Sequence, residues 1–222
     1  MRIEIWSDVV CPWCYVGKRN FEAALAAFEH RDDVEVTYRS FELDPSAPAV
    51  RHGDYVAHLA RKYGMSQTQA QNMIDSMTKT GAGAGVVLDF ERARPGNTFD
   101  AHRLLHLAKE KGVQQPLKER LMRATFTDGE PIGDREALVR LAAEAGIPPE
   151  EAVAALEGGA YAAEVRADEA LALELGISAV PYFVVDRKFG IPGAQAPDVI
   201  LQVLQRAWEK SGAPPATADG AP

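Results

Sequence analysis

The chain has 222 residues, which corresponds to about one or two domains. Hydrophobic residues make up 46% and charged residues 25%, the balance of an ordinary globular protein that can bury a large core. A net charge of −8 without any run of Lys or Arg argues against a nucleic-acid partner, and no apolar stretch reaches the roughly 18 residues of a membrane span.

The N-terminal sequence MRIEIWSDVV predicts a strand over about residues 2–7, because apolar Ile3 and Ile5 alternate with polar neighbours. It lacks the apolar core region and the small-residue cleavage site of a secretory signal. We therefore expect a cytoplasmic protein, in a compartment that keeps most thiols reduced.

A helix and a second strand are expected next. Pro12 suits the first turn of a helix, where its missing N–H costs nothing, and Phe21, Leu25 and Phe28 recur at helical spacing. The alternating, β-branched sequence at 34–43 predicts a strand. Strand, helix and strand in this order indicate the start of a βαβ unit with a parallel sheet.

The chain from about 51 to 160 is predicted to be helical, with about six or seven helices. One of them begins at Ser66 with a capping-box pattern and stops at Gly81. The glycine-rich sequence GAGAG at 81–85 predicts a flexible hinge or loop. A further helix is expected over 97–112.

Strand signals return only near the end of the chain. The sequence VPYFVVD at 180–186 predicts a strand, and a tight turn, a short strand and a closing helix with Pro197 near its start are expected after it. The last residues, 213–222, contain no apolar residue larger than Ala and predict a disordered tail. The predicted organisation is a discontinuous α/β domain, 1–50 plus 160–212, interrupted by a helical insertion, 51–159.

Both cysteines of the chain, Cys11 and Cys14, stand at the predicted start of the first helix. A disulfide between them would close a very small loop and restrict the unfolded chain little, which argues against a structural role. Only a thiolate attacks a disulfide, and a helix N-terminus lowers the pKa of a thiol. We therefore predict Cys11, at the helix tip, as the attacking thiol with a lowered pKa and Cys14, one turn inside, as the resolving thiol.

Half of a zinc site is the alternative interpretation of a Cys-x-x-Cys sequence. Such a site needs two more soft ligands, and no cysteine remains. His102 and His106 are four residues apart but lack the glutamate of a zinc protease motif. We therefore expect no metal.

Several motifs occur together and in order: SDVVCPWC, NTFDAHRL, VPYFVVD and GIPGAQ. With them the chain resembles, over about residues 1–208, the DsbA family of disulfide oxidoreductases, and within it the FrnE-like branch. The resemblance implies an α/β thioredoxin fold, with a central mixed sheet flanked by helices and a large all-helical insertion over the active site. It implies Cys11 as nucleophile, Cys14 as resolving thiol and Pro181 as a cis proline, so that Val180 would dock the substrate backbone.

Other site residues are less determined by the sequence. Pro12 and Trp13 are expected to tune the cysteine pair, and Trp13 should point outward beside the thiol as a surface for substrate. Asp8 is either a buried proton acceptor for the resolving thiol or a turn residue at the end of a strand. Asn97 is either a helix cap or part of the cleft, and His102 either borders the core or lines the cleft.

The predicted function is therefore thiol–disulfide oxidoreduction, with disulfide isomerisation as a further activity. It needs no prosthetic group, and glutathione is a candidate co-substrate. The partner would be a cysteine-containing protein or a small thiol or disulfide, and the protein itself is expected to be a monomer or a homodimer. Two alternatives stay open. One is a glutathione-dependent isomerase or transferase of the 2-hydroxychromene-2-carboxylate isomerase or kappa type, although these typically carry Ser at the position of Cys11. The other is a peptide-binding holdase.

Overall fold

The computed structural model describes residues 1–51 and 53–211, so the predicted disordered tail, 213–222, lies outside the described residues. Its strands are β1 (Arg2–Ser7), β2 (Glu35–Ser40), β3 (Tyr182–Val185) and β4 (Phe189–Pro192). Its α-helices are α1 (Pro12–Ala26), α2 (Tyr55–Tyr63), α3 (Gln67–Gly83), α4 (Phe99–Glu110), α5 (Gln114–Arg123), α6 (Arg135–Glu144), α7 (Pro149–Glu157), α8 (Ala162–Glu174) and α9 (Pro197–Lys210).

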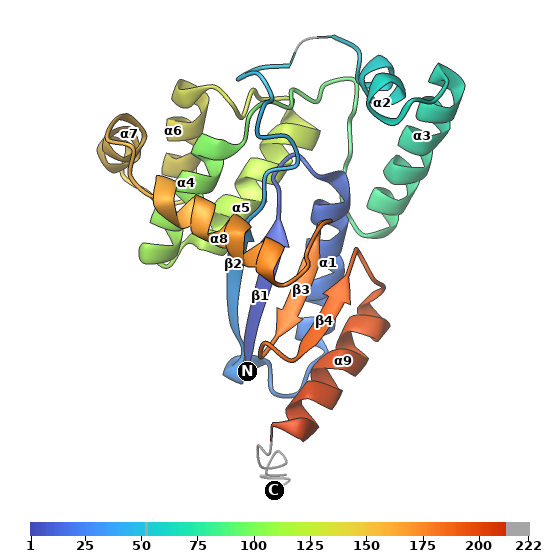
Figure 1. Cartoon of the computed structure of the whole chain (residues 1–222), viewed down its shortest axis with the longest axis vertical. Coiled ribbons are helices and arrows are strands. Elements are labelled where there is room, and N and C mark those ends of the chain that lie inside the picture. Colours follow the sequence, from blue (N-terminus) through green and yellow to red (C-terminus); the bar gives the residue numbers. More distant parts are fainter. Residues whose placement is uncertain (52, 212–222) are drawn as a thin grey trace, which may run out of the picture.

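The strands form one mixed sheet in the order β2-β1-β3-β4. β1 and β2 are parallel and are joined through α1, which confirms the predicted βαβ unit. β3 is antiparallel to both β1 and β4. In the register of this sheet Ile5 of β1 lies between Tyr38 of β2 and Phe183 of β3. The fold is therefore the expected α/β thioredoxin fold with a central mixed sheet (Figure 1).

Successive side chains of β1 point to opposite faces of the sheet, and the two faces pack against different helices. Ile3 and Ile5 join a core with Phe21 of α1 and Leu204 of α9, which pack against each other on one face. Trp6 points to the opposite face and belongs to a smaller cluster beside α8. Its indole N–H donates to a backbone carbonyl of α8 at 2.9 Å, so α8 covers this face of the sheet.

The described elements between β2 and β3 are helical, as predicted. α4, α5, α6 and α7 share one hydrophobic core, whereas α2 and α3 pack against each other and reach α1 (Figure 1). A second core joins Leu59 of α2 and Met77 of α3 to both cysteines. The α2–α3 pair therefore forms the apolar cover of the cysteine-bearing end of α1. We propose to divide the chain as the sequence predicts, with the helical insertion at 51–159.

One predicted helix boundary is confirmed and one is wrong. Ser66 caps α3, and the reciprocal hydrogen bonds with Gln69 complete the predicted capping box. The sequence GAGAG is not a hinge over its whole length, because α3 continues to Gly83. Gly81 is buried, and a Cβ atom there would lie 2.8 Å from Leu88, so this glycine permits a close packing contact inside the helix.

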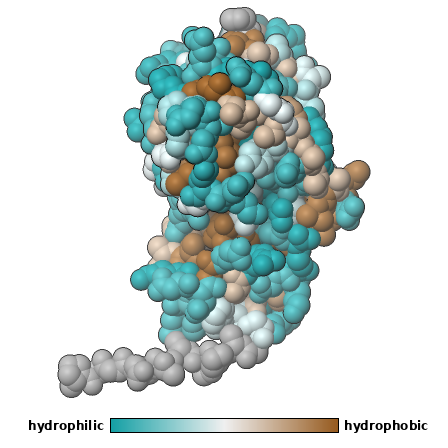
Figure 2. Space-filling view, turned by 90° about the vertical axis from the view of Figure 1, so that its left-hand side faces the viewer, coloured by the Kyte–Doolittle hydropathy of each residue, from teal (hydrophilic) through white to brown (hydrophobic). Residues whose placement is uncertain are grey.

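The surface on the α6 and α7 side is mostly hydrophilic, with separate hydrophobic patches between charged and polar residues (Figure 2). None of the described helices is both long enough and apolar enough to span a bilayer.

Candidate active site

The start of α1 holds the cysteine pair. Cys11 is the N-cap residue with extended backbone geometry, and Pro12 occupies the first turn as predicted. The Cys14 amide donates to the Cys11 sulfur at 3.2 Å, so the thiol takes the capping role that a Ser hydroxyl often has. Both cysteines are free thiols and both are buried. The adjacent Trp13 is 40% exposed and points outward, as predicted.

The loop before β3 faces this pair. The Val180–Pro181 peptide bond is cis, as the resemblance implies. The Cys11 thiol donates to the Val180 carbonyl at 3.7 Å, which brings residues far apart in the sequence into contact. The Pro181 carbonyl accepts the Gly193 amide at 2.8 Å, and this bond holds the loop against the GIPGAQ motif.

Gly17 of α1 allows Pro181 to pack this closely. A Cβ atom at Gly17 would lie 2.8 Å from the Pro181 ring, closer than packed atoms tolerate. We expect Gly17→Ala to lower the free energy of unfolding by about 1–3 kcal/mol, the usual cost of overpacking, and to displace the loop from Cys11. Chemical denaturation measures the first effect. The matched control is Gly83→Ala, since nothing lies within 4 Å of a Cβ atom at that helical position. Equal stability of the two variants would contradict this packing role.

A cavity of about 300 Å³ opens beside Cys11. Its walls come from the start of α1, from α2 and α3, from the loop after β2, from the start of α4 and from the cis-proline loop. Its apolar side chains include Trp13, Tyr55, Leu59, Met73, Met77 and Val180, and its cationic ones are Arg51 and Lys62. A reacting thiol, an apolar wall and a few charged groups in one cavity are what a small-molecule or peptide site requires.

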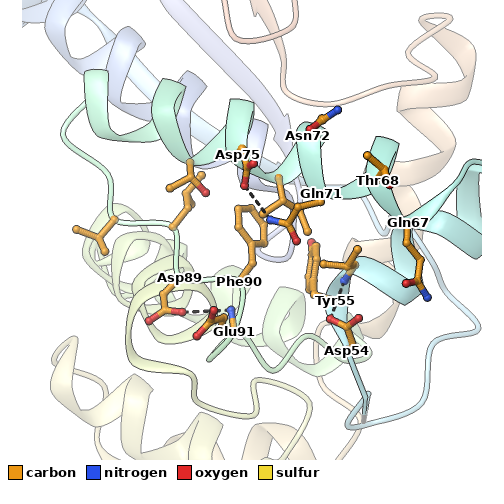
Figure 3. Close-up of a pocket in the computed structure, with 15 residues that line it drawn as sticks. Asp54, Tyr55, Gln67, Thr68, Gln71, Asn72, Asp75, Asp89, Phe90 and Glu91 are labelled. Carbon is orange, nitrogen blue, oxygen red and sulfur yellow. Dashed lines mark hydrogen bonds between the residues drawn. The ribbon is translucent and has the colours of Figure 1, made fainter.

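A larger groove of about 920 Å³ lies between α2, α3 and the segment 87–91. Tyr55 lines both cavities, and its ring meets Phe90 with 4.9 Å between ring centroids (Figure 3). The carboxylates of Asp54, Asp75, Asp89 and Glu91 surround this groove. Neither cysteine lines it, so thiol chemistry belongs to the smaller cavity.

The pKa of Cys11 is the site property that sequence reasoning got wrong. The helix N-terminus predicts a lowered pKa, but burial raises the pKa of this thiol well above its ordinary value. The neighbouring Cys14 thiol and the Asp8 carboxylate raise it further, and only the hydrogen bond from the Cys14 amide opposes them. Burial therefore outweighs the helix N-terminus in setting the pKa of this thiol.

Asp8 lies fully buried at the cavity wall. Its carboxylate accepts the Leu43 amide at 2.8 Å and lies 3.3 Å from Nε2 of His102. Burial alone would raise the pKa of Asp8, but the hydrogen bond and charge of His102 and the Leu43 amide outweigh it and keep the pKa below its ordinary value. A carboxyl with a lowered pKa is a weak base, which disfavours Asp8 as the proton acceptor.

The two remaining predicted cleft residues do not line the cavity. His102 is 1% exposed and stands behind Asp8, so it orients that carboxylate from within the core. Asn97 accepts the Phe99 amide at 3.0 Å and donates to the Pro45 carbonyl at 3.1 Å. The N-cap residue of α4 is Thr98, so Asn97 stands one residue before the cap, where its side chain binds the first helical amide and ties the helix to the loop after β2.

Sequence reasoning missed the residues that the insertion contributes. Arg51 of the loop after β2 and His58 and Lys62 of α2 reach the cavity only because the insertion folds over α1. Lys118 of α5 is completely buried, and its ammonium group donates to the Ser7 carbonyl at 3.2 Å. No local signal marks these residues, since lysine and arginine are normally exposed.

Fold and site together define a thioredoxin-fold protein with a dithiol at a helix N-terminus, facing a cis-proline loop. The chain belongs to the DSBA-like thioredoxin domain family, whose profile matches residues 2–205. This confirms the family and the fold that the motifs indicate.

Two relatives support this membership, one of them a solved structure, and a further solved structure shares the fold. A probable DsbA oxidoreductase of Streptomyces coelicolor is 48% identical, with a TM-score of 0.90 over 100% of this chain and 94% of its own. The uncharacterized Bacillus subtilis protein YwbO is 33% identical over 95% of this chain and 98% of its own. The cytosolic disulfide reductase DsbM of Pseudomonas aeruginosa, 17% identical, has the same fold over 95% of this chain and all of its own, with a TM-score of 0.67. None of them is named as FrnE-like, so that branch stays a prediction.

Proposed function

We propose that this protein is a thiol–disulfide oxidoreductase that uses Cys11 as nucleophile and Cys14 as resolving thiol, with disulfide isomerisation as a further activity. The observation that carries the proposal is the contact of the Cys11 thiol with both the Cys14 amide, at 3.2 Å, and the Val180 carbonyl, at 3.7 Å, at the wall of a cavity. A thiol in this place can form a mixed disulfide with a bound substrate, and Cys14 can then displace the substrate sulfur.

Substrate docking would use the loop before Pro181. The Val180 amide makes no hydrogen bond to another described residue, and its side chain lines the cavity. An extended substrate can therefore pair with this backbone while its sulfur reaches Cys11. The exposed ring of Trp13 offers an apolar contact on the other side. These features support a cysteine-containing polypeptide as one substrate class.

A small anionic thiol or disulfide is the second substrate class, with glutathione as the candidate co-substrate. Arg51 and Lys62 line the cavity, and the only carboxylates among its described lining residues are Asp8 and Asp44. Asp44 is paired with Arg51 at 2.8 Å. Burial lowers the pKa of His58, and the nearby cations Arg51 and Lys62 lower it further, whereas Asp44 opposes them. We also propose a cytoplasmic location, where glutathione is abundant. DsbM, which has a related fold, is described as cytosolic and was solved with glutathione.

The experiment measures steady-state reduction of oxidised glutathione by the protein, with a dithiol reductant present to reduce the Cys11–Cys14 disulfide after each turnover and the uncatalysed rate subtracted. Because a solvent-exposed charge pair contributes up to about 1 kcal/mol, we expect Lys62→Ala to raise KM about two- to fivefold and to leave kcat nearly unchanged. Reduction of 2-hydroxyethyl disulfide, which is uncharged, should not change. Lys79→Ala, which removes an exposed lysine of α3 outside the cavity, is the matched control. The same KM for oxidised glutathione in all three proteins would contradict the anionic substrate, and no reduction of either disulfide would contradict the proposed function.

A further inference from the structure

The cations of the cavity beside Cys11 all lie on one of its walls. Arg51 and Lys62 come from the loop after β2 and from α2. The start of α1 and the loop before β3 line the cavity with uncharged residues, which are Pro12, Trp13, Ser178, Ala179 and Val180. In Figure 1, α2 and the start of β3 lie on different sides of the start of α1. The two walls therefore present different chemistry to the two halves of a disulfide that Cys11 attacks.

The uncharged wall offers its backbone to an extended polypeptide. The amides of Ser178, Ala179 and Val180 make no hydrogen bond to another described residue. Ser178 and Ala179 are exposed, and so is the ring of Trp13. Free backbone amides at an exposed position can pair with the backbone of an extended peptide. A polypeptide can therefore lie along this rim with its sulfur beside Cys11, whose thiol contacts the Val180 carbonyl at 3.7 Å.

The cationic wall offers a positive charge to a small anionic group. The Nζ atom of Lys62 makes no ion pair with another described residue and lies over the Tyr63 ring, 5.7 Å from its centroid. Arg51 is already paired with Asp44 at 2.8 Å. The other carboxylate of the lining, Asp8, is fully buried and hydrogen-bonded. Lys62 is therefore left to bind a carboxylate of a ligand.

The volume of the cavity decides which half of a substrate can enter it. About 300 Å³ is at the lower end of the range of small-molecule sites, so the cavity can hold a small thiol but not a folded chain. Leu59, Met73 and Met77 also line it and can pack against the carbon atoms of such a thiol. A polypeptide reaches Cys11 only along the exposed rim. One disulfide satisfies both walls when it joins a polypeptide cysteine to a small anionic thiol.

We propose that this protein acts on mixed disulfides between a polypeptide cysteine and a small anionic thiol, and that it removes the small thiol from the polypeptide. The inference rests on the proposed function and deepens it, because it combines the two substrate classes in one molecule. The polypeptide lies along the loop before Pro181, and the small thiol occupies the cavity toward Lys62.

Electrons and protons balance between the reduced protein, its substrate and water. Cys11 loses its proton to water, and its thiolate attacks the polypeptide sulfur. The bond from Cys11 to that sulfur forms as the bond to the small thiol breaks, and the small thiolate takes up a proton from water. Cys14 then loses its proton and attacks the Cys11 sulfur, which releases the polypeptide as a thiol. Both cysteines are oxidised to one disulfide, the substrate is reduced to two thiols, and a small dithiol reductant restores the pair before the next turnover.

Four disulfides separate the contributions of the two walls. They are a short uncharged peptide with one cysteine joined to glutathione, the same peptide joined to 2-mercaptoethanol, oxidised glutathione and 2-hydroxyethyl disulfide. A single exposed charge contact, like a single hydrogen bond, strengthens binding by up to about fivefold. We therefore expect the peptide–glutathione disulfide to react at least about fivefold faster than either the peptide–mercaptoethanol disulfide or oxidised glutathione. The second-order rate constant of a single turnover by reduced protein, followed by acid quenching and mass spectrometry, measures this.

The Lys62→Ala variant tests the cationic wall. It should lower the advantage of the peptide–glutathione over the peptide–mercaptoethanol disulfide about two- to fivefold, because it removes the charge that binds the small thiol. Lys79→Ala, which lies outside the cavity, should leave this advantage unchanged. An unchanged advantage in Lys62→Ala, or an equal loss in Lys79→Ala, would overturn the inference.

The Cys14→Ser variant tests which half Cys11 attacks. With the peptide–glutathione disulfide, the trapped adduct on Cys11 should be the peptide, and glutathione should be released. A glutathione adduct on Cys11 would overturn the inference. Equal rate constants for the peptide–glutathione disulfide and for either compound that lacks one of its halves would overturn it too. These results would leave the proposed function intact, whereas no reaction with any of the four disulfides would contradict the proposed function itself.

Discussion

The Cys11→Ser protein is expected to lose thiol–disulfide exchange by about a thousandfold or more while it stays folded. A hydroxyl does not replace a thiolate as the nucleophile toward a disulfide, so no mixed disulfide forms. The fold should survive because Cys11 is the N-cap of α1 and its sulfur accepts the Cys14 amide. A Ser hydroxyl makes the same capping bond and is a preferred N-cap. Exchange with oxidised glutathione and thermal unfolding measure the two effects.

Cys11→Ala separates the cap from the chemistry. It removes both the nucleophile and the capping acceptor, so it should be as inactive as Cys11→Ser and less stable than that variant by about 1 kcal/mol. Retained exchange in either variant would exclude Cys11 as the nucleophile. Equal stability of the two variants would show that the capping bond contributes nothing, without affecting the chemistry.

The elements that carry the cysteines and the cis proline were predictable because their signals are local. Alternation marks β1, the position of Pro12 marks the start of α1, and the capping box marks the start of α3. In each of these cases a few neighbouring residues determine the outcome. The parallel pairing of β1 and β2 follows from the βαβ order, whereas the sequence analysis made no prediction of the strand order β2-β1-β3-β4.

The electrostatics of the site depended on contacts that no local pattern contains. The α2–α3 pair buries Cys11, and this burial outweighs the helix N-terminus in setting the pKa of the thiol. His102 was assigned to the border of the core or to the cleft, yet it lies in the core behind Asp8, because α4 packs against the segment that follows β1. Lys118 is adjacent to an apolar stripe in the sequence, where a lysine ordinarily turns to solvent.

The second prediction with a large expected effect concerns substitution of the resolving thiol, Cys14. Cys14 is 1% exposed and lies one helical turn behind Cys11, so it cannot meet a bulky substrate before Cys11 does. We expect Cys14→Ser to keep the attack by Cys11 and to lose the displacement of the substrate sulfur. A mixed disulfide on Cys11 should therefore accumulate and decay at least about a hundredfold more slowly than in the unsubstituted protein. Cys14→Ala should behave in the same way, which excludes an effect of a buried hydroxyl.

Intact mass spectrometry of the Cys14→Ser protein, after incubation with oxidised glutathione and acid quenching, tests the two-thiol mechanism most directly. The mechanism predicts one glutathione per chain, attached to Cys11, whereas the unsubstituted protein should end as an internal disulfide without an adduct. An unmodified Cys14→Ser protein, or a stable glutathione adduct on the unsubstituted protein, would contradict it. The second of these results would favour the glutathione-dependent isomerase or transferase class.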